Sequence, residues 1–139
     1  MIHFCRYYSG AEDYFTHQVG HALDLHDDNK QSGISPAYGY ENEYSTHLYA
    51  RKAVEAIEKH ATENKQEPMF MYLAFQAIHS PDEVPSRYSD RFKSSIPNQH
   101  RRSVAGMIAA LDEAIGNVSR ALERTQMIQD TTIVFTTDK

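Results

Sequence analysis

At residues 69–75 the chain reads Met-Phe-Met-Tyr-Leu-Ala-Phe, an uninterrupted apolar run that directly follows Pro68. A run of this length, bounded by a proline and rich in aromatic side chains, is typical of a strand buried on both faces. Residues 131–137, which read Thr-Thr-Ile-Val-Phe-Thr-Thr, are mostly β-branched and predict a second strand. These two segments are the expected centre of the fold.

Two amphipathic helices are predicted around these strands, because apolar residues recur every three or four positions. The first helix follows Ser45 or Thr46, either of which can cap a helix through its side-chain oxygen. Its apolar positions are Ala50, Ala53, Val54, Ile57 and Ala61. Those of the second helix are Val104, Met107, Ile108, Leu111, Ile115, Val118 and Leu122.

The order of these elements predicts the fold class. Two buried strands joined through a helix form a right-handed βαβ unit with parallel strands. We therefore expect an α/β fold whose αβαβ core spans residues 46–139, with a long proline-containing loop at 76–99. Residues 1–45 have weak periodicity and predict an irregular segment, with one short strand around His21 to Leu25.

Composition limits the classes of function. The 139 residues suggest one domain or part of one, and the net charge of −5 disfavours a nucleic-acid surface. No stretch approaches the roughly 18 apolar residues of a membrane span. The first residues lack a signal-peptide pattern, which predicts a cytosolic protein or a true N-terminus upstream. The single cysteine excludes a disulfide within the chain.

Two polar residues follow the predicted strands at their carboxyl ends, where the chemistry of open α/β sheets gathers. His79 lies four residues after Phe75 and can bind an anion or transfer a proton near neutral pH. Asp138 lies three residues after Phe135 and can ligate a hard cation such as calcium or magnesium. The structural alternatives are a surface loop histidine for His79, and a helix cap or a solvated terminus for Asp138.

Other candidate residues have weaker support. His17 and His21 have the spacing of two metal ligands on a helix, but Gly20 and the lack of an apolar period disfavour that helix. Cys5 has no activating motif, which favours a structural or free thiol. Asn117 begins the sequon Asn-Val-Ser and should face away from the apolar stripe of its helix, where it could carry a glycan.

Several segments, taken in order, resemble the arylsulfatase B-like branch of the sulfatase family. They are Gly-Ala-Glu-Asp-Tyr-Phe-Thr-His at 10–17, Tyr-Ser-Thr at 44–46, Met-Tyr-Leu-Ala-Phe-Gln-Ala-Ile-His-Ser-Pro at 71–81, Gly-Met-Ile-Ala-Ala-Leu-Asp-Glu-Ala-Ile-Gly-Asn-Val at 106–118 and Phe-Thr-Thr-Asp at 135–138. The resemblance covers nearly the whole chain. It implies that residues 1–139 are an internal part of an alkaline-phosphatase-like catalytic domain.

The resemblance also implies a function. Sulfatases of this type hydrolyse sulfate esters of small molecules or glycosaminoglycans, as N-acetylgalactosamine-4-sulfatase does. They use calcium and a formylglycine nucleophile made from cysteine. His79 matches the histidine that contacts the substrate sulfate, and Asp138 matches a calcium ligand that an asparagine normally follows, where Lys139 stands here. Asn117 matches a glycosylation site, and the family is lysosomal or secreted.

Some family motifs have no counterpart in the chain. There is no Cys-x-Pro-Ser-Arg motif, no first aspartate pair and no Gly-Lys-Trp-His motif. We therefore expect the isolated chain to be inactive, because no nucleophile is present. With its strands unpartnered, we expect it to be poorly stable or to self-associate. The alternatives are a short non-catalytic protein that binds anions through His79, and, less favoured, a metal-dependent phosphodiesterase of the same superfamily.

Overall fold

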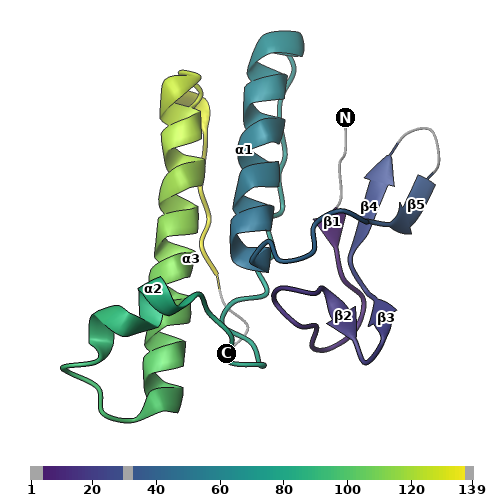
Figure 1. Cartoon of the computed structure of the whole chain (residues 1–139). Helices are drawn as coiled ribbons and strands as arrows, with labels where there is room; N and C mark the ends of the chain where they lie inside the picture. The colour runs from purple at the N-terminus through teal and green to yellow at the C-terminus, as the bar shows by residue number, and fades with distance from the viewer. Residues whose placement is uncertain (1–4, 30–32, 137–139) are drawn as a thin grey trace.

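Two long helices lie side by side, and small antiparallel sheets lie next to the start of the first of them, on the side away from the second (Figure 1). The computed structural model describes residues 5–29 and 33–136. The long helices are α1 (Ser45–Glu63) and α3 (Gln99–Arg124). Between them come the short helix α2 (Ser86–Ser89) and the 3-10 turn η1 (Asp90–Phe92), and a second 3-10 turn, η2 (Ile128–Asp130), follows α3.

The first part of the chain is more ordered than its sequence indicates. Strands β1 (Cys5–Arg6), β4 (His26–Asn29) and β5 (Gly33–Pro36) form an antiparallel sheet in the order β1-β4-β5. Strands β2 (Gln18–Val19) and β3 (Ala22–Leu23) form a separate hairpin, and β3 confirms the expected short strand. The other strands escaped prediction because short, polar strands pair through backbone groups without an apolar pattern.

Helix α1 covers the predicted residues, but its N-cap residue differs from the prediction. Tyr44 occupies the N-cap position in extended conformation, and its side chain makes no capping hydrogen bond. The expectation that Ser45 or Thr46 caps the helix is therefore wrong. The hydroxyl of Ser45 instead donates a hydrogen bond of 2.6 Å to the side-chain carbonyl of Gln76. Helix α3, in contrast, is capped by Asn98, whose side chain accepts from the backbone N–H of Arg101 at 3.0 Å.

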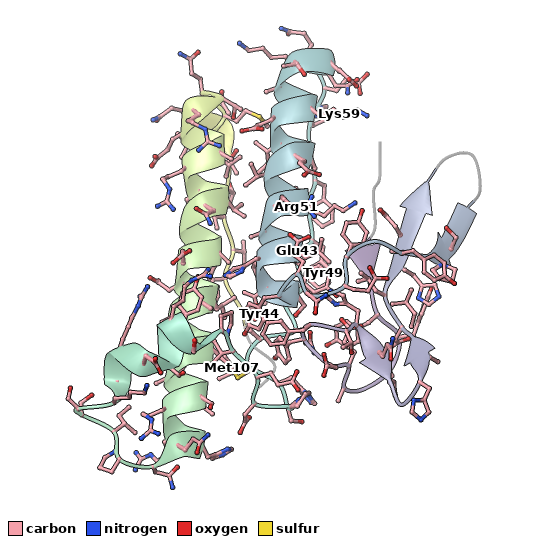
Figure 2. All side chains as sticks on the ribbon, in the orientation of Figure 1. Glu43, Tyr44, Tyr49, Arg51, Lys59 and Met107 are labelled. Carbon is pink, nitrogen blue, oxygen red and sulfur yellow. The ribbon has the colours of Figure 1, made fainter. Side chains whose placement is uncertain are left out.

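The helices and the first segment share a core of three apolar clusters. One cluster joins Tyr14 and Tyr44 to Met107 of α3. Figure 2 shows Tyr44 and Met107 at the level where α1 begins. A second cluster, around Leu25, Leu48 and Tyr49, joins the N-terminal sheets to α1, and a third, around Ile57, Ala121 and Leu122, joins α1 to α3. These contacts fix the long helices against each other.

Residues 69–75 run alongside α1 as a single extended segment (Figure 1). Alternate side chains face the helices: Met69 and Met71 pack on the third cluster, and Leu73 and Phe75 pack on the second. The side chains between them point outward, so that Phe70 is 92% exposed and Tyr72 81% exposed. The expectation that both faces are buried is therefore wrong, because only one face is covered by this chain.

The predicted parallel pairing is also corrected. Within residues 5–29 and 33–136, the only strand ladders are antiparallel, and neither 69–75 nor 131–136 belongs to one. Ile133, Val134 and Phe135 are exposed as well. A strand is defined by a ladder of hydrogen bonds to a neighbouring strand, and neither segment forms such a ladder with the described residues. The βαβ order is present along the chain, but without its hydrogen-bonded sheet.

The exposed side of segment 69–75 predicts self-association. Phe70 and Tyr72 are highly exposed aromatic residues on a segment that belongs to no strand ladder among the described residues, so we expect this surface to pair with another copy. Light scattering of the purified chain should give a mass above 15.9 kDa. The double variant Phe70→Lys/Tyr72→Lys should return it to the monomer. The control Ile34→Lys/Tyr38→Lys, which alters other exposed apolar residues, should not; a monomeric unmutated chain at high concentration would refute the prediction.

Gly106 sets the contact between α2 and α3. A Cβ atom added there would lie 2.9 Å from the backbone nitrogen of Ser89 and 3.1 Å from Cγ1 of Val84. We expect Gly106→Ala to lower the free energy of unfolding by about 1–3 kcal/mol, because backbone must move to relieve the overlap. Gly116→Ala is the matched control, since its Cβ meets only the flexible end of Arg120. Urea unfolding should show the control unchanged or stabilised by about 1 kcal/mol; equal effects would disprove the contact.

Candidate functional site

His79 lies on the loop of residues 76–85, which contacts the first residue of α1 through Gln76 and Ser45. Its side chain is exposed. Its ring atom Nδ1 lies 2.9 Å from the carbonyl oxygen of Ser80 and 3.4 Å from the hydroxyl of the same residue. A carbonyl only accepts hydrogen bonds, so Nδ1 carries the proton in this arrangement. Nε2 is therefore the ring atom presented to a ligand. Asp138 lies outside the described residues, so its distance from His79 is not defined.

Gln76 anchors the start of this loop. Its side chain is buried, donates a hydrogen bond of 2.6 Å to the backbone carbonyl of Glu12 and accepts one of 2.6 Å from Ser45. The backbone carbonyl of Gln76 in turn accepts from the N–H of His79 at 2.9 Å. The loop is thus tied both to α1 and to the segment that contains Glu12.

Tyr14 holds the loop at two further residues, His79 and Glu83. Its phenol donates to the backbone carbonyl of His79 at 2.7 Å, and its backbone N–H donates to Glu83 Oε2 at 2.9 Å. Its own carbonyl accepts from the N–H of Ser45 at 2.8 Å. Tyr44 stacks on Tyr14 at 5.3 Å between ring centroids and donates to the carbonyl of Glu83 at 3.0 Å.

The two phenols are held in their protonated form. Burial raises the pKa of the Tyr14 phenol, and burial raises the pKa of the Tyr44 phenol to about 12. Burial likewise raises the pKa of the Glu83 carboxyl, against the hydrogen bond that it accepts from Tyr14. Both tyrosines therefore remain hydrogen-bond donors throughout the neutral range.

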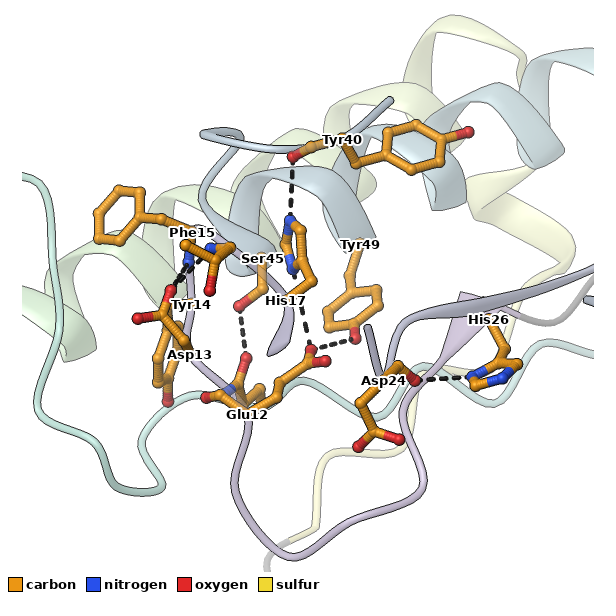
Figure 3. Close-up of polar contacts among 12 residues, drawn as sticks. Glu12, Asp13, Tyr14, Phe15, His17, Asp24, His26, Tyr40, Ser45 and Tyr49 are labelled. Atoms are coloured by element: carbon orange, nitrogen blue, oxygen red, sulfur yellow. Dashed lines mark hydrogen bonds and ion pairs between the residues drawn. The ribbon is translucent and has the colours of Figure 1, made fainter. Parts of the chain in front are cut away.

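Glu12 and His17, which flank Tyr14 in the sequence, form a buried pair (Figure 3). Glu12 is 0% exposed and His17 is 1% exposed, with Oε1 of Glu12 3.9 Å from Nδ1 of His17. Tyr49 donates to the same carboxylate oxygen at 3.2 Å, and Nε2 of His17 donates to the carbonyl of Tyr40 at 3.1 Å. Burial lowers the pKa of His17, but Glu12 and the carbonyl partners outweigh burial and raise it overall.

The metal-site candidates do not come together. His17 is buried in the pair with Glu12, whereas His21 is exposed in the turn between β2 and β3, so the two do not share a helix face. Within the described ranges, no group of three or more histidine, cysteine or carboxylate side chains could hold a metal ion. These residues alone do not fit a calcium site. The side chain of Cys5 is not among those described.

Asn117 is exposed on α3. Its side-chain oxygen accepts a hydrogen bond from Arg120 at 2.6 Å. It lines an open cleft of about 320 Å³ between α1 and α3, together with His47, Ala50, Arg51, Val54, Arg87, Glu113 and Arg124. Figure 2 shows Arg51 on α1 beside Glu43, with which it forms an ion pair at 2.7 Å.

The sequence indicated His79 but not the residues that hold it. Tyr14, Gln76 and Glu12 act through their burial and through partners distant along the chain, which no periodicity signals. The available signal was the polar pair Glu12 and Asp13 directly before the aromatic residues Tyr14 and Phe15. Chemically, the arrangement presents an exposed imidazole on an anchored loop, which suits hydrogen bonding to an anion.

No helix of the described residues combines the length and the apolar character that crossing a bilayer requires.

Comparison with known proteins identifies the family of the chain. The family model for Sulfatase matches residues 4–139. Arylsulfatase J of Mus musculus is 35% identical over 130 residues, which is 93% of this chain and 21% of that protein. The chain thus spans about a fifth of the length of this curated relative.

Solved structures share the fold. Ps i-CgsB in complex with k-i-k-neocarrahexaose is similar with a TM-score of 0.71 and 23% identity, covering 90% of this chain and 29% of that one. Ps i-CgsB alone gives a TM-score of 0.72 at 24% identity with the same coverage. yidJ from Bacteroides fragilis, described as a sulfatase, gives 0.61 at 18% identity over 74% of this chain and 26% of that one. The partial alkaline-phosphatase-like α/β fold is confirmed, and the chain belongs to the sulfatase family.

Proposed function

We propose that this chain is an internal part of a calcium-dependent sulfatase that hydrolyses sulfate esters, of the arylsulfatase or N-acetylgalactosamine-4-sulfatase type. The family membership and the partial coverage of the relatives support this proposal. The observation that carries it is His79, an exposed imidazole on a loop anchored from both sides. The substrate in the complete enzyme is a sulfated small molecule or a glycosaminoglycan.

In this proposal, His79 contacts the sulfate group. With the Nδ1 proton donated to the carbonyl of Ser80, a hydrogen bond from Nε2 to a sulfate oxygen requires the doubly protonated ring. An imidazolium is a stronger donor to an anion than a neutral ring, and its charge offsets that of the sulfate. His79 would therefore stabilise negative charge on the sulfate oxygens as the ester bond breaks.

We further propose that Asp138 ligates calcium with oxygen ligands from outside the described residues. Calcium takes about 6–8 oxygens, so one aspartate is far from a complete site. Bound calcium would supply a positive charge next to the sulfate. With no nucleophile motif in residues 1–139, the isolated chain should not hydrolyse sulfate esters.

A non-catalytic role is the second candidate. The exposure of His79 favours it, because weak anion binding needs neither nucleophile nor metal. Calorimetric titration of the isolated chain with sulfate, and separately with calcium, tests this role. Heat of binding at millimolar ligand supports it, and its absence removes it.

We propose a lysosomal or secreted location and a glycan on Asn117. The exposed side chain on α3 is accessible to modification. When the protein is secreted from animal cells, Asn117→Gln should abolish a mass increment that glycosidase treatment also removes. An unchanged mass would show that the sequon is unused.

Sequencing the full transcript tests the main proposal. A Cys-x-Pro-Ser-Arg motif encoded upstream of Met1 is the expected result. A transcript that begins at Met1 and encodes no such cysteine motif would contradict the enzymatic role and leave only the binding role.

A further inference from the structure

We propose that Tyr14 is a positioning residue for His79, holding the imidazole where it meets the sulfate of the substrate. The inference rests on the proposed function, because it assigns Tyr14 a role in that reaction. The two residues are far apart in the sequence but joined directly, since the Tyr14 phenol donates to the His79 carbonyl at 2.7 Å.

Hydrogen bonds fix His79 at three points. Its backbone N–H donates to Gln76 and its backbone carbonyl accepts from Tyr14, so the peptide groups on both sides of its Cα atom are held. The bond from Nδ1 to the carbonyl of Ser80 then fixes the rotation of the ring. Of these three contacts, only the one from Tyr14 is made by a buried side chain outside the loop, and it acts directly on the His79 backbone.

Tyr14 is itself held by packing and by hydrogen bonds. Its ring is 0% exposed and packs with Tyr44 and Met107, and its backbone is bonded to Glu83 and Ser45. The phenol therefore acts as a fixed point for the loop. Correct placement of a group that meets the reacting atoms has a steep effect on rate, and a displacement of about 1 Å can cost about a hundredfold.

Tyr44 provides a matched control. It is also buried, stacks on Tyr14 and donates to a loop carbonyl, but the carbonyl belongs to Glu83 and not to His79. Tyr14→Phe and Tyr44→Phe each remove one hydroxyl and keep the ring. If buried hydroxyls only stabilise the fold, the two substitutions should affect the enzyme alike.

The experiment uses the complete enzyme containing this chain and measures kcat and KM for an aryl sulfate. Tyr14→Phe should lower kcat/KM by about tenfold, mostly through kcat, with Tyr44→Phe within about twofold of the unmutated enzyme. Both substitutions are then repeated in the His79→Ala background. There Tyr14→Phe should have no further effect, because its effect passes through His79.

Each outcome decides the matter. A tenfold loss that persists in the His79→Ala background, or an equal loss with Tyr44→Phe, makes Tyr14 merely structural and overturns the inference while the function stands. An unmutated complete enzyme without hydrolysis overturns the function and the inference with it. If Tyr14→Phe fails to fold, Glu83→Ala takes its place, because it removes the acceptor of the Tyr14 N–H. The loss of kcat/KM caused by Glu83→Ala should likewise vanish in the His79→Ala background.

Discussion

Replacing His79 with alanine in the complete enzyme should lower kcat for an aryl sulfate by about 10²–10³-fold. The substitution removes a hydrogen-bond donor to the sulfate, whose interaction with the sulfate oxygens should strengthen as the ester bond breaks. The backbone of residue 79 keeps its bonds to Gln76 and Tyr14, so the loop should retain its position.

The control is His21→Ala, which removes an equally exposed histidine from the turn between β2 and β3. It should leave kcat unchanged. His79→Gln, which keeps a side-chain N–H without the charge, should fall between the alanine variant and the unmutated enzyme. A loss below about tenfold for His79→Ala would remove this residue from the sulfate-binding set.

Replacing Glu12 with alanine should lower the free energy of unfolding by about 3–5 kcal/mol. The substitution leaves His17 buried without its carboxylate partner and removes the acceptor of the Tyr49 hydroxyl. Breaking a buried pair is costly because the remaining group keeps its desolvation penalty. Urea or thermal unfolding measures the change, with Glu55→Ala as the control. Glu55 pairs with Arg51 on the surface, so its loss should cost less than about 1 kcal/mol.

The pH dependence of this effect has a definite sign. The pKa of His17 is raised in the folded protein, so its protonated form is stabilised by folding. That contribution is fully present below the unfolded pKa of about 6.5 and is lost as the pH rises through the folded pKa. The difference between the unmutated protein and Glu12→Gln should therefore be largest at acidic pH. A difference independent of pH would mean that His17 stays neutral.

The helices could be predicted from the sequence because their apolar spacing is regular. α3 has a longer extent than its apolar stripe, since Asn98 caps it before the first apolar position at Val104. The extended segments lie at the residues that the sequence predicts, but the predicted parallel pairing between them is absent from the described residues. Hydrogen bonds of a sheet depend on which strands are neighbours, and the apolar run at 69–75 indicates burial without saying what covers it. Here the helices cover one side only.

The site could be predicted only in part. His79 stood out because it follows a predicted strand at its carboxyl end, where the chemistry of open α/β sheets gathers. The structure places it on an exposed, anchored loop. Asp138 lies outside the described residues, so its role stays a prediction. The supporting residues depend on contacts between segments, such as Tyr14 with His79, that sequence spacing does not encode.

Hydrolysis of an aryl sulfate by the complete protein, compared with the isolated residues 1–139, tests the central claim most directly. We expect calcium-dependent turnover by the complete protein, loss of that turnover on chelation, and none by the isolated chain. A complete protein that carries the cysteine motif yet leaves sulfate esters intact, or an isolated chain that cleaves them, would contradict the account.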